Sequence, residues 1–272
     1  MGLLDRGVEI KTPDQIDGMR RAGLVVGETL ELLRSSVRVG VTTGELDAIA
    51  EDNIRSSGAT PSFKGYHGFP GSICTSVDDE VVHGIPGGRV LADGDIVSID
   101  CGAIVDGWHG DAAITVPVGT VAPELLELIR VTEQAMWRGI AAARLGGRVT
   151  DISHAVESHV RAAGSYGILE DYVGHGIGSA MHQPPNVPNF GRPGRGPKLV
   201  QGLALAVEPM VTLGGKESVV LEDDWTVVTA DGSWAAHSEH TFTLTPRGAW
   251  VLTALDGGEA QLTALGVPFG GA

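Results

Sequence analysis

The sequence of 272 residues predicts an α/β (α+β) fold of two similar ααββ halves, with an antiparallel sheet at the centre and helices outside it. Three observations lead to this prediction. The order of two helices followed by strands occurs twice along the chain. Residues 40–58 also align with residues 146–164, with glycine at both ends of each segment. An Asp-Gly pair at 106–107 stands between two strand-like segments, as in a two-residue hairpin. Generic helix patterning is the alternative explanation for part of the alignment.

Two helices open the first half. The residues Thr-Pro-Asp-Gln at 12–15 supply an N-cap, a proline at N1 and a glutamine at N3. Apolar residues follow at helical spacing: Ile16, Met19, Val26, Leu30 and Leu33. The second helix begins near Thr42, has Glu45 as its capping-box partner and ends at Gly58. Its inward-facing residues are Leu46, Ile49 and Ile54. Strand-like segments follow at 72–76, 80–83, 95–103 and 110–117.

The second half repeats this order within one domain that spans residues 1–272. Pro123 opens a helix whose apolar spine is Leu126, Ile129, Met136 and Ile140. Another helix is expected from about Thr150 to Gly164. Strand-like segments follow at 202–208, 217–221, 225–229 and 237–244. The halves therefore extend over about 12–117 and 122–246, and residues 255–272, which carry no motif, are expected to form a loosely held tail.

Composition limits the functional class and the compartment. The net charge of -15 argues against broad nucleic-acid binding, which needs clustered Lys and Arg. The two cysteines, Cys74 and Cys101, do not form a disulfide framework and favour a reducing compartment. The first eleven residues lack the apolar region of a signal peptide, and no run approaches the roughly 18 apolar residues of a membrane span. We therefore expect a cytoplasmic protein without a membrane partner.

The predicted hairpin brings two aspartates together. With Asp106-Gly107 as the central turn residues, Gly102 faces Asp111 and Asp100 faces Ala113. The two carboxylates then share a face of the sheet as diagonal neighbours, with Cβ atoms roughly 7 Å apart or less. Gly102 is expected to leave space between them. Buried like charges at this distance favour a bound cation, and the alternative is an exposed pair on a solvated face.

A duplicated fold should hold acidic counterparts in the second half. Glu208 ends a strand as Asp100 does, and Glu239 lies on the following strand of that half. Their spacing requires about 20 extra residues between the two strands, which the segment 211–232 supplies. The four carboxylates would balance two divalent cations, which together activate water for hydrolysis.

His175 is the nitrogen-ligand candidate. Glycines on both sides of it permit close approach of the backbone and of a ligand. The alternatives are a purely structural histidine and a nucleotide loop. A nucleotide loop would need a following helix, which Pro184 and Pro185 prevent. Mixed oxygen and imidazole ligands suit Co, Mn, Fe or Zn, and the sequence does not choose among these metals.

At this point the motifs resemble a known family. Over about residues 11–254 the chain is similar to a type I methionine aminopeptidase of the pita-bread fold, in a short bacterial-like form. The motifs that carry the resemblance are YHGFPGSICTSVDDEVVHGIP, SIDCG, HGD, GHGIG, VEPM and SEHT. The resemblance implies a pseudo-twofold duplication with a curved central sheet. It also implies removal of the initiator methionine from nascent proteins and peptides when the second residue is small.

Site roles follow from the same resemblance. It implies a dinuclear metal site held by Asp100, Asp111, His175, Glu208 and Glu239, with Asp111 and Glu239 bridging. Glu208 would also accept and donate the proton. His182 would stabilise the carbonyl oxygen, and His83 would hold the backbone of the second residue. The α-amine would bind the metal nearer Asp100. A pocket for the methionine side chain would be lined by Phe63, Tyr66, Cys74, Met181 and Trp225.

Two positions depart from the family pattern, which usually has an aromatic residue at 181 and an acidic residue at 183. Here they are Met181 and Gln183. These changes are expected to affect the pocket more than the metal site. The partners implied are N-terminal Met peptides and nascent chains, with transient ribosome contact and a monomeric enzyme. Two competing hypotheses are a non-catalytic binding protein on this fold and an aminopeptidase of different specificity.

Overall fold

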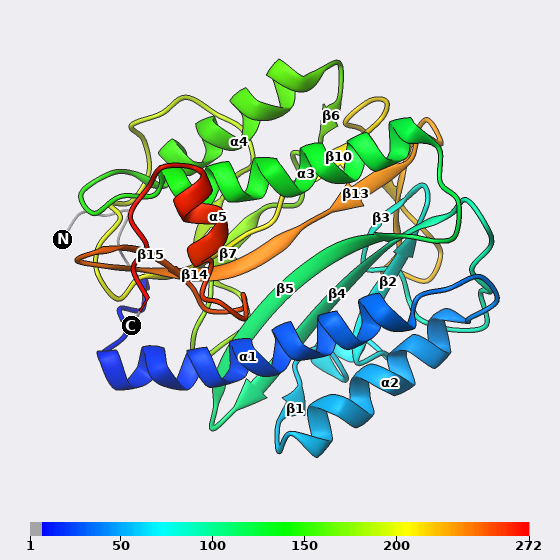
Figure 1. The fold of residues 1–272 in the computed structure, drawn as a ribbon, viewed down its shortest axis with the longest axis horizontal. Helices are drawn as coiled ribbons and strands as arrows, with labels where there is room; N and C mark the ends of the chain where they lie inside the picture. Colours follow the sequence, from blue (N-terminus) through cyan, green and yellow to red (C-terminus); the bar gives the residue numbers. More distant parts are fainter. Residues whose placement is uncertain (1–6, 272) are drawn as a thin grey trace.

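The computed structural model describes residues 7–271. Residues 1–6 and 272 lie outside the described residues. The expectation that the first eleven residues are not a signal peptide falls partly on residues 1–6. Four long helices and a short C-terminal one pack on a large sheet (Figure 1). None of the described helices is long and apolar enough to cross a membrane. The helices are α1 (Pro13–Ser36), α2 (Thr43–Ser56), α3 (Pro123–Ala142), α4 (Val149–Ala163) and α5 (Glu259–Ala264).

The helix starts follow the local sequence signals. Thr12 and Thr42 both form capping boxes, with Gln15 and Glu45 as their partners. The spine predicted for α3 was wrong in one place, because Leu126 is exposed while Leu125 and Leu128 are buried. Adjacent leucines fit helical periodicity in two rotations, and only packing on the sheet selects one of them.

The central sheet has nine antiparallel strands. Its main path runs in the order β1-β4-β5-β14-β9-β7-β8, with β2 beside β4 and β15 beside β14. Their bounds are β1 (Thr60–Pro61), β2 (Ile73–Val77), β4 (Ile96–Val105), β5 (Trp108–Pro117), β7 (Gly174–Gly176), β8 (Gln183–Val187), β9 (Ala204–Val207), β14 (Glu239–Thr245) and β15 (Gly248–Val251).

The two halves meet where β5 pairs with β14. On one side β5 pairs with β4, and on the other β14 pairs with β9, so the order of strands is symmetric about this junction. Each side has its own hydrophobic core. Leu30 and Leu46 of α1 and α2 pack with residues of β4 and β5 in one, and Met136 and Val156 of α3 and α4 pack with β9 and β14 in the other. The predicted fold class is confirmed.

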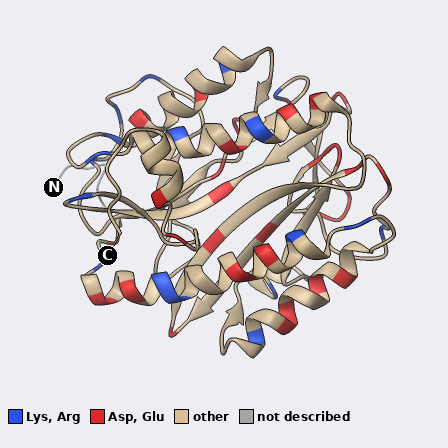
Figure 2. Ribbon diagram, in the orientation of Figure 1, with Lys and Arg blue, Asp and Glu red and all other residues tan. Residues whose placement is uncertain are grey.

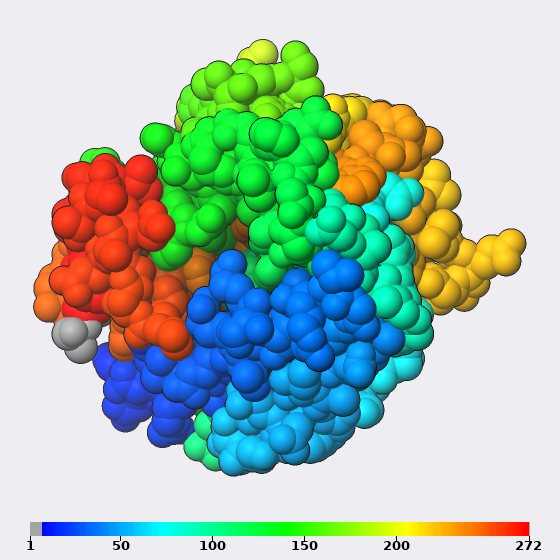
Figure 3. All heavy atoms as spheres, turned by 45° about the vertical axis from the view of Figure 1, so that its right-hand side comes forward, coloured from blue at the N-terminus to red at the C-terminus, as the bar shows by residue number. Residues whose placement is uncertain are grey.

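Six further strands form two small sheets. One sheet has the order β11-β12-β3, formed by Ser218–Val220, Val227–Thr229 and Glu80–Val82, and the other has the order β13-β10-β6, formed by Ala235–His237, Met210–Thr212 and Gly167–Ile168. The segment 211–232 therefore folds largely into the β11–β12 hairpin, which projects at the right of Figure 3.

The C-terminal segment is packed rather than loosely held, so the expectation for residues 255–272 was wrong over the described part. Leu262 of α5 is fully buried among residues of the second core. The amide of Gly270 donates to the Ala249 carbonyl at 2.7 Å, and Phe269 forms a β-bridge to Ala249. The segment lacks a recognisable motif because a single buried leucine and main-chain pairing are enough to hold it.

Replacing Leu262 by alanine is expected to destabilise the fold by about 2–5 kcal/mol, because it leaves a cavity in a closed core. The measurement is the free energy of unfolding from urea titration. Leu255→Ala is the matched control, since Leu255 lies close by in the chain but is 49% exposed. Equal stability of the two variants would show that α5 does not contribute to the core.

Candidate metal centre

Five adjacent strands of the sheet each contribute one metal-ligand candidate. Asp100 lies on β4, Asp111 on β5 and Glu239 on β14. Glu208 directly follows β9, and His175 is the middle residue of β7. Acidic segments are visible on the central strands between the helices in Figure 2. Residues far apart in the chain are thus brought into one row by strand pairing.

The hairpin has the predicted register. Asp106 and Gly107 have φ values of 49° and 82°, as a type I′ turn requires. Gly102 is paired with Asp111 and Asp100 with Ala113. The space expected beside Gly102 is filled, because a Cβ atom there would lie 2.7 Å from the Phe63 ring and 2.8 Å from the Ser62 side chain. The absence of a side chain at Gly102 therefore allows Phe63 and Ser62 to pack there as a wall of the site, and no cavity for an ion remains.

His175 is held with one ring nitrogen free. Its Nδ1 lies 2.9 Å from the carbonyl oxygen of Gly176, to which it donates in the neutral Nδ1–H tautomer. The lone pair of Nε2 then faces Glu208 Oε1 at 3.4 Å. The flanking glycines are required by close backbone contact, because a Cβ at Gly174 would lie 2.3 Å from the Ala206 carbonyl oxygen. The hydrogen bond from His175 Nδ1 to the Gly176 carbonyl is of the kind that usually orients an imidazole that binds metal through its other nitrogen.

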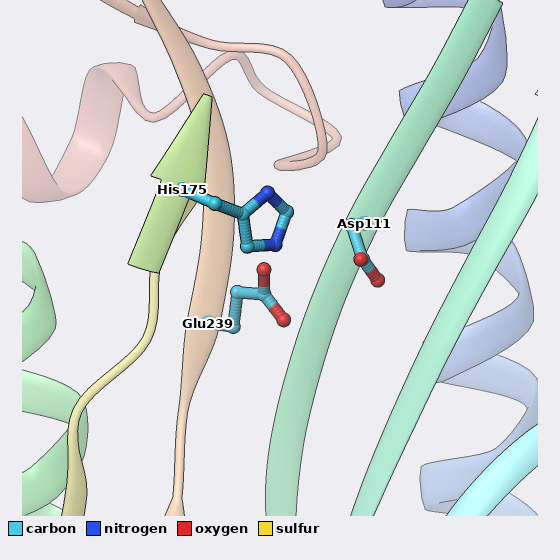
Figure 4. Close-up of side chains that lie close together, drawn as sticks. All are labelled: Asp111, His175 and Glu239. Carbon is cyan, nitrogen blue, oxygen red and sulfur yellow. The ribbon is translucent and has the colours of Figure 1, made fainter. Parts of the chain in front are cut away.

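The ligand atoms converge. One atom from each of Asp111, His175 and Glu239 lies within 4.8 Å of the other two, and Figure 4 shows the three side chains close together. Glu208, His237 and Glu239 form a second group within the same limit. His237 was not among the residues selected from the sequence. The hydroxyl of Thr241 bridges the two central strands by donating to the Asp111 carbonyl at 2.8 Å.

Burial favours the protonated form of these carboxyl groups in the metal-free protein. It raises the pKa of Asp100 to about 7, and it raises the pKa values of Asp111, Glu208 and Glu239 well above their usual range, with neighbouring carboxylates adding to the shift. Among residues 7–271, one buried oxygen in each of Asp100, Asp111 and Glu239 has no hydrogen-bond partner. Unpaired buried oxygens and mutual repulsion both fit a site for divalent cations.

Metal-free protein is expected to lose stability as the pH rises from about 6.5 to about 8. In the unfolded chain these carboxyl groups ionise near pH 4, whereas the folded chain retains their protons to higher pH because their pKa values are raised. The folded state then binds more protons, so its stability falls with rising pH. Histidines with a lowered pKa, such as His83 and His175, oppose this decline only below about pH 7, where the unfolded chain still protonates them in part.

The measurement is the thermal unfolding midpoint of chelator-treated protein at several pH values in that window. Added divalent metal should flatten the decline, because cations take the place of the protons. A midpoint that is independent of pH without metal would contradict the electrostatic interpretation of the cluster.

A cavity of about 120 Å³ joins the ligand cluster to an apolar pocket. All of the candidate residues selected from the sequence line it, and Phe69 is an additional lining residue that the sequence did not indicate. Phe63, Phe69, Cys74 and Met181 form a buried cluster, with Trp225 packed against it. The ring of Phe69 meets that of Trp225 edge-on at 5.1 Å. The cavity therefore combines polar ligands at one side with an apolar wall at the other.

His182 is positioned by Tyr66. The Tyr66 hydroxyl lies 2.9 Å from His182 Nδ1, and the His182 ring packs edge-on against that of His175 with centroids 4.4 Å apart. Burial lowers the pKa of His182, so the imidazole is neutral at pH 7. With the tyrosine donating to Nδ1, the proton of the imidazole is on Nε2. His182 can then donate a hydrogen bond from Nε2.

His83 occupies a strained backbone position at the end of β3. Its φ is 61°, which is rare for a residue with a side chain. Its ring meets those of Tyr172 and Trp225 edge-on. The next residue, Gly84, has to be glycine, because a Cβ atom there would lie 2.2 Å from the Thr75 carbonyl oxygen. The strained backbone at His83 directs its imidazole to the cavity, where it forms part of the lining. Strained backbone positions of this kind are common at functional sites.

The N-terminal segment fixes the loop between His175 and His182. The Glu9 carboxylate accepts from the amide and hydroxyl of Ser179, and the buried Lys11 ammonium lies 3.4 Å from Glu9 and 3.3 Å from Gln183 Oε1. Glu9 thus supplies an acidic group close to Gln183, where the family pattern has an acid. The sequence did not indicate this arrangement, because its members are about 170 residues apart in the chain.

A larger groove of about 430 Å³ lies between α1 and α3, where Figure 3 shows a hollow. Its lining includes Leu30, Met136 and His240. His240 and Glu239 are successive strand residues, so their side chains point to opposite faces of the sheet. The groove is therefore on the helix-covered face, and the ligand cluster is on the other.

Comparison with known proteins shows similarity to metallopeptidases. The model of metallopeptidase family M24 matches residues 17–230. The methionine aminopeptidase of Clostridium acetobutylicum is 53% identical over 245 residues, covering 90% of this chain and 98% of that protein. Methionine aminopeptidase 1 of Mycobacterium tuberculosis is 52% identical over 254 residues, covering 91% and 96%. The crystal structure of methionine aminopeptidase from Thermotoga maritima matches with a TM-score of 0.89 at 41% identity, covering 91% and 99%.

Proposed function

The chain belongs to metallopeptidase family M24 and acts as a methionine aminopeptidase, and from this premise we propose that two divalent metal ions serve removal of the initiator methionine. The observation that carries the proposal is the cavity in which the ligand cluster and the apolar pocket are continuous. Cleavage requires that the second residue of the substrate be small, because this residue lies against the cavity wall that holds His83.

Five residues would hold the ions. These ligands are Asp100, Asp111, His175, Glu208 and Glu239, with Asp111 and Glu239 shared between the two ions. The shared role of Glu239 is supported by its presence in both groups of converging ligand atoms. When bound, the ions supply Lewis acidity to the scissile carbonyl and lower the pKa of attacking water. Co, Mn, Fe and Zn all suit this mixture of carboxylate and imidazole ligands.

Three protein side chains act at the scissile bond, one by transferring a proton and two by donating hydrogen bonds. Glu208 accepts the proton of the attacking water and delivers it to the leaving amine, a role consistent with its buried carboxyl group. His182 donates from Nε2 to the carbonyl oxygen as negative charge develops there. His83 donates to the backbone of the second residue and keeps the scissile bond in place.

Specificity for N-terminal methionine follows from the two sides of the cavity. The carboxylate cluster, on the side of Asp100, is the end that accommodates a free α-amine. The apolar cluster of Phe63, Tyr66, Cys74, Met181 and Trp225 accommodates an unbranched thioether side chain, with Phe69 as a further contact. An internal peptide bond lacks the free α-amine that this end of the cavity is proposed to bind.

A matched peptide series tests the proposal. Met-Gly and Met-Ala peptides are expected to be cleaved in the presence of Co, Mn, Fe or Zn, whereas Met-Lys and Lys-Ala peptides are expected to resist. Cleavage of Lys-Ala would favour an aminopeptidase of different specificity. Failure to hydrolyse any peptide with any of these metals would favour a non-catalytic binding protein.

The partners follow from the substrate. N-terminal Met peptides and nascent chains would reach the enzyme in the cytoplasm, with transient contact to the ribosome and without a membrane or nucleic-acid partner. A monomer suffices, because every residue proposed for the site comes from one chain.

A further inference from the structure

His237 is a buried imidazole of the site without a role in the proposed reaction. It ends β13, two residues before Glu239, and is only 1% exposed. Among the described residues its Nε2 has no hydrogen-bond partner. Buried polar atoms are nearly always paired, so an unpaired nitrogen in such a place needs a physical explanation.

The free nitrogen faces the ligand cluster. His237 Nε2 lies 3.8 Å from Glu208 Oε2, while Glu208 Oε1 lies 3.4 Å from His175 Nε2. The Glu208 carboxylate thus stands between two imidazoles, each facing one of its oxygens. Together with Glu239, His237 and Glu208 present ligand atoms that all lie within 4.8 Å of one another.

The position of His237 is fixed by its main chain. Its amide donates to Thr115 Oγ1 at 3.0 Å and approaches Ser98 Oγ at 3.3 Å, and its carbonyl accepts from Thr115 Oγ1 at 2.8 Å. On the other edge it pairs with Met210 of β10. The strand is therefore anchored on both sides, and the imidazole is presented to the cluster from a rigid support.

The separation of 3.8 Å distinguishes coordination from hydrogen bonding. It exceeds the N–H···O range, so Glu208 does not satisfy the nitrogen directly. Two ligand atoms that are each about 2.1 Å from one transition-metal ion stand about 3–4 Å apart. The distances from Glu208 to both histidines fall within that interval.

We propose that His237 is a second imidazole ligand of the metal centre and binds, through Nε2, an ion that Glu208 and Glu239 also hold. This inference rests on the proposed function, since it presumes a metalloenzyme. A second nitrogen ligand favours Zn, Co and Fe over Mn, because imidazole binds the later ions more strongly. His237 thereby biases the choice of metal, which the carboxylates alone do not determine.

X-ray absorption at the zinc edge tests the inference on the full chain loaded with two equivalents of zinc. Because His175 and His237 belong to separate groups of converging ligand atoms, the wild-type spectrum is expected to show an average of one imidazole per zinc and the His237→Gln spectrum one half. His237→Gln should also weaken zinc binding at least about tenfold by calorimetry. The matched control is His240→Gln, because His240 lies on β14 with its Nδ1 2.8 Å from Thr253 Oγ1, on the opposite face from Glu239.

The outcomes separate this inference from the proposed function. An average of one half imidazole per zinc in the wild-type protein would overturn the role of His237 and leave the metalloenzyme intact. A protein that binds no zinc, manganese or cobalt would overturn both. The wild-type count needs no variant, so it decides the question even where a substitution impairs folding. A loss of imidazole in His240→Gln as well would also count against a specific role for His237.

Discussion

Replacing Asp111 by asparagine is expected to abolish turnover and to lower the metal content of the purified protein. Asp111 lies beside Glu239 in the row of ligands and is 3% exposed. Its carboxylate is proposed to be shared by two ions, and an amide cannot supply two anionic oxygens. A loss of about 4 kcal/mol of electrostatic stabilisation corresponds to about 10³-fold in kcat/KM. The measurements are peptide hydrolysis and metal analysis of the same preparation.

The control lies on the same hairpin. Asp106→Asn changes an exposed turn residue paired with Arg21, and asparagine tolerates its positive φ. This variant should retain activity and metal. Folding of Asp111→Asn is checked by thermal unfolding without metal, where it should equal or exceed the wild type because one of the crowded carboxyl groups is gone. Wild-type activity in Asp111→Asn would remove the bridging assignment.

Local rules were sufficient for the hairpin and for its acidic counterparts. The Asp-Gly turn fixes the register, and the register alone puts Asp100 and Asp111 on one face. The twofold order of elements then points to Glu208 and Glu239. The helix caps at Thr12 and Thr42 are equally local, since each depends on a residue three positions away.

Other parts of the site depend on contacts that no local pattern encodes. The strands β7 and β8 are rich in Gly and Pro, so their composition indicates loops although they complete the sheet. The role of Glu9 and Lys11 requires that the N-terminal segment pass the loop at Ser179. His237 is visible only once β13 is placed beside β10. In each case the decisive partner is distant in sequence.

The same division explains the errors. Gly102 seemed to leave room for an ion because only its paired strand was considered, while Phe63 approaches from another segment. The tail at 255–271 seemed unattached because its main-chain pairing to Ala249 has no sequence signature. Side-chain periodicity predicts which face is buried, but it does not predict which segment covers that face.

His182→Ala is expected to lower kcat about 10²-fold or more while the metals remain bound. His182 packs against His175 but is absent from both groups of converging ligand atoms, so its role is directed at the substrate. Removing one donor to a developing oxyanion costs about 2.7 kcal/mol or more, which sets the expected factor. Single-turnover kinetics and metal analysis measure the two quantities separately.

Tyr66→Phe refines the same test, because it removes only the hydroxyl that lies 2.9 Å from His182 Nδ1. The imidazole then remains in the cavity but loses the partner that places its proton on Nε2. A smaller fall in kcat than in His182→Ala is therefore expected, again with unchanged metal content. If His182→Ala instead lost metal, the imidazole would be a ligand and the oxyanion role would be wrong. If Tyr66→Phe matched His182→Ala in kcat, the tautomer, and not the presence of the ring, would be what the chemistry requires.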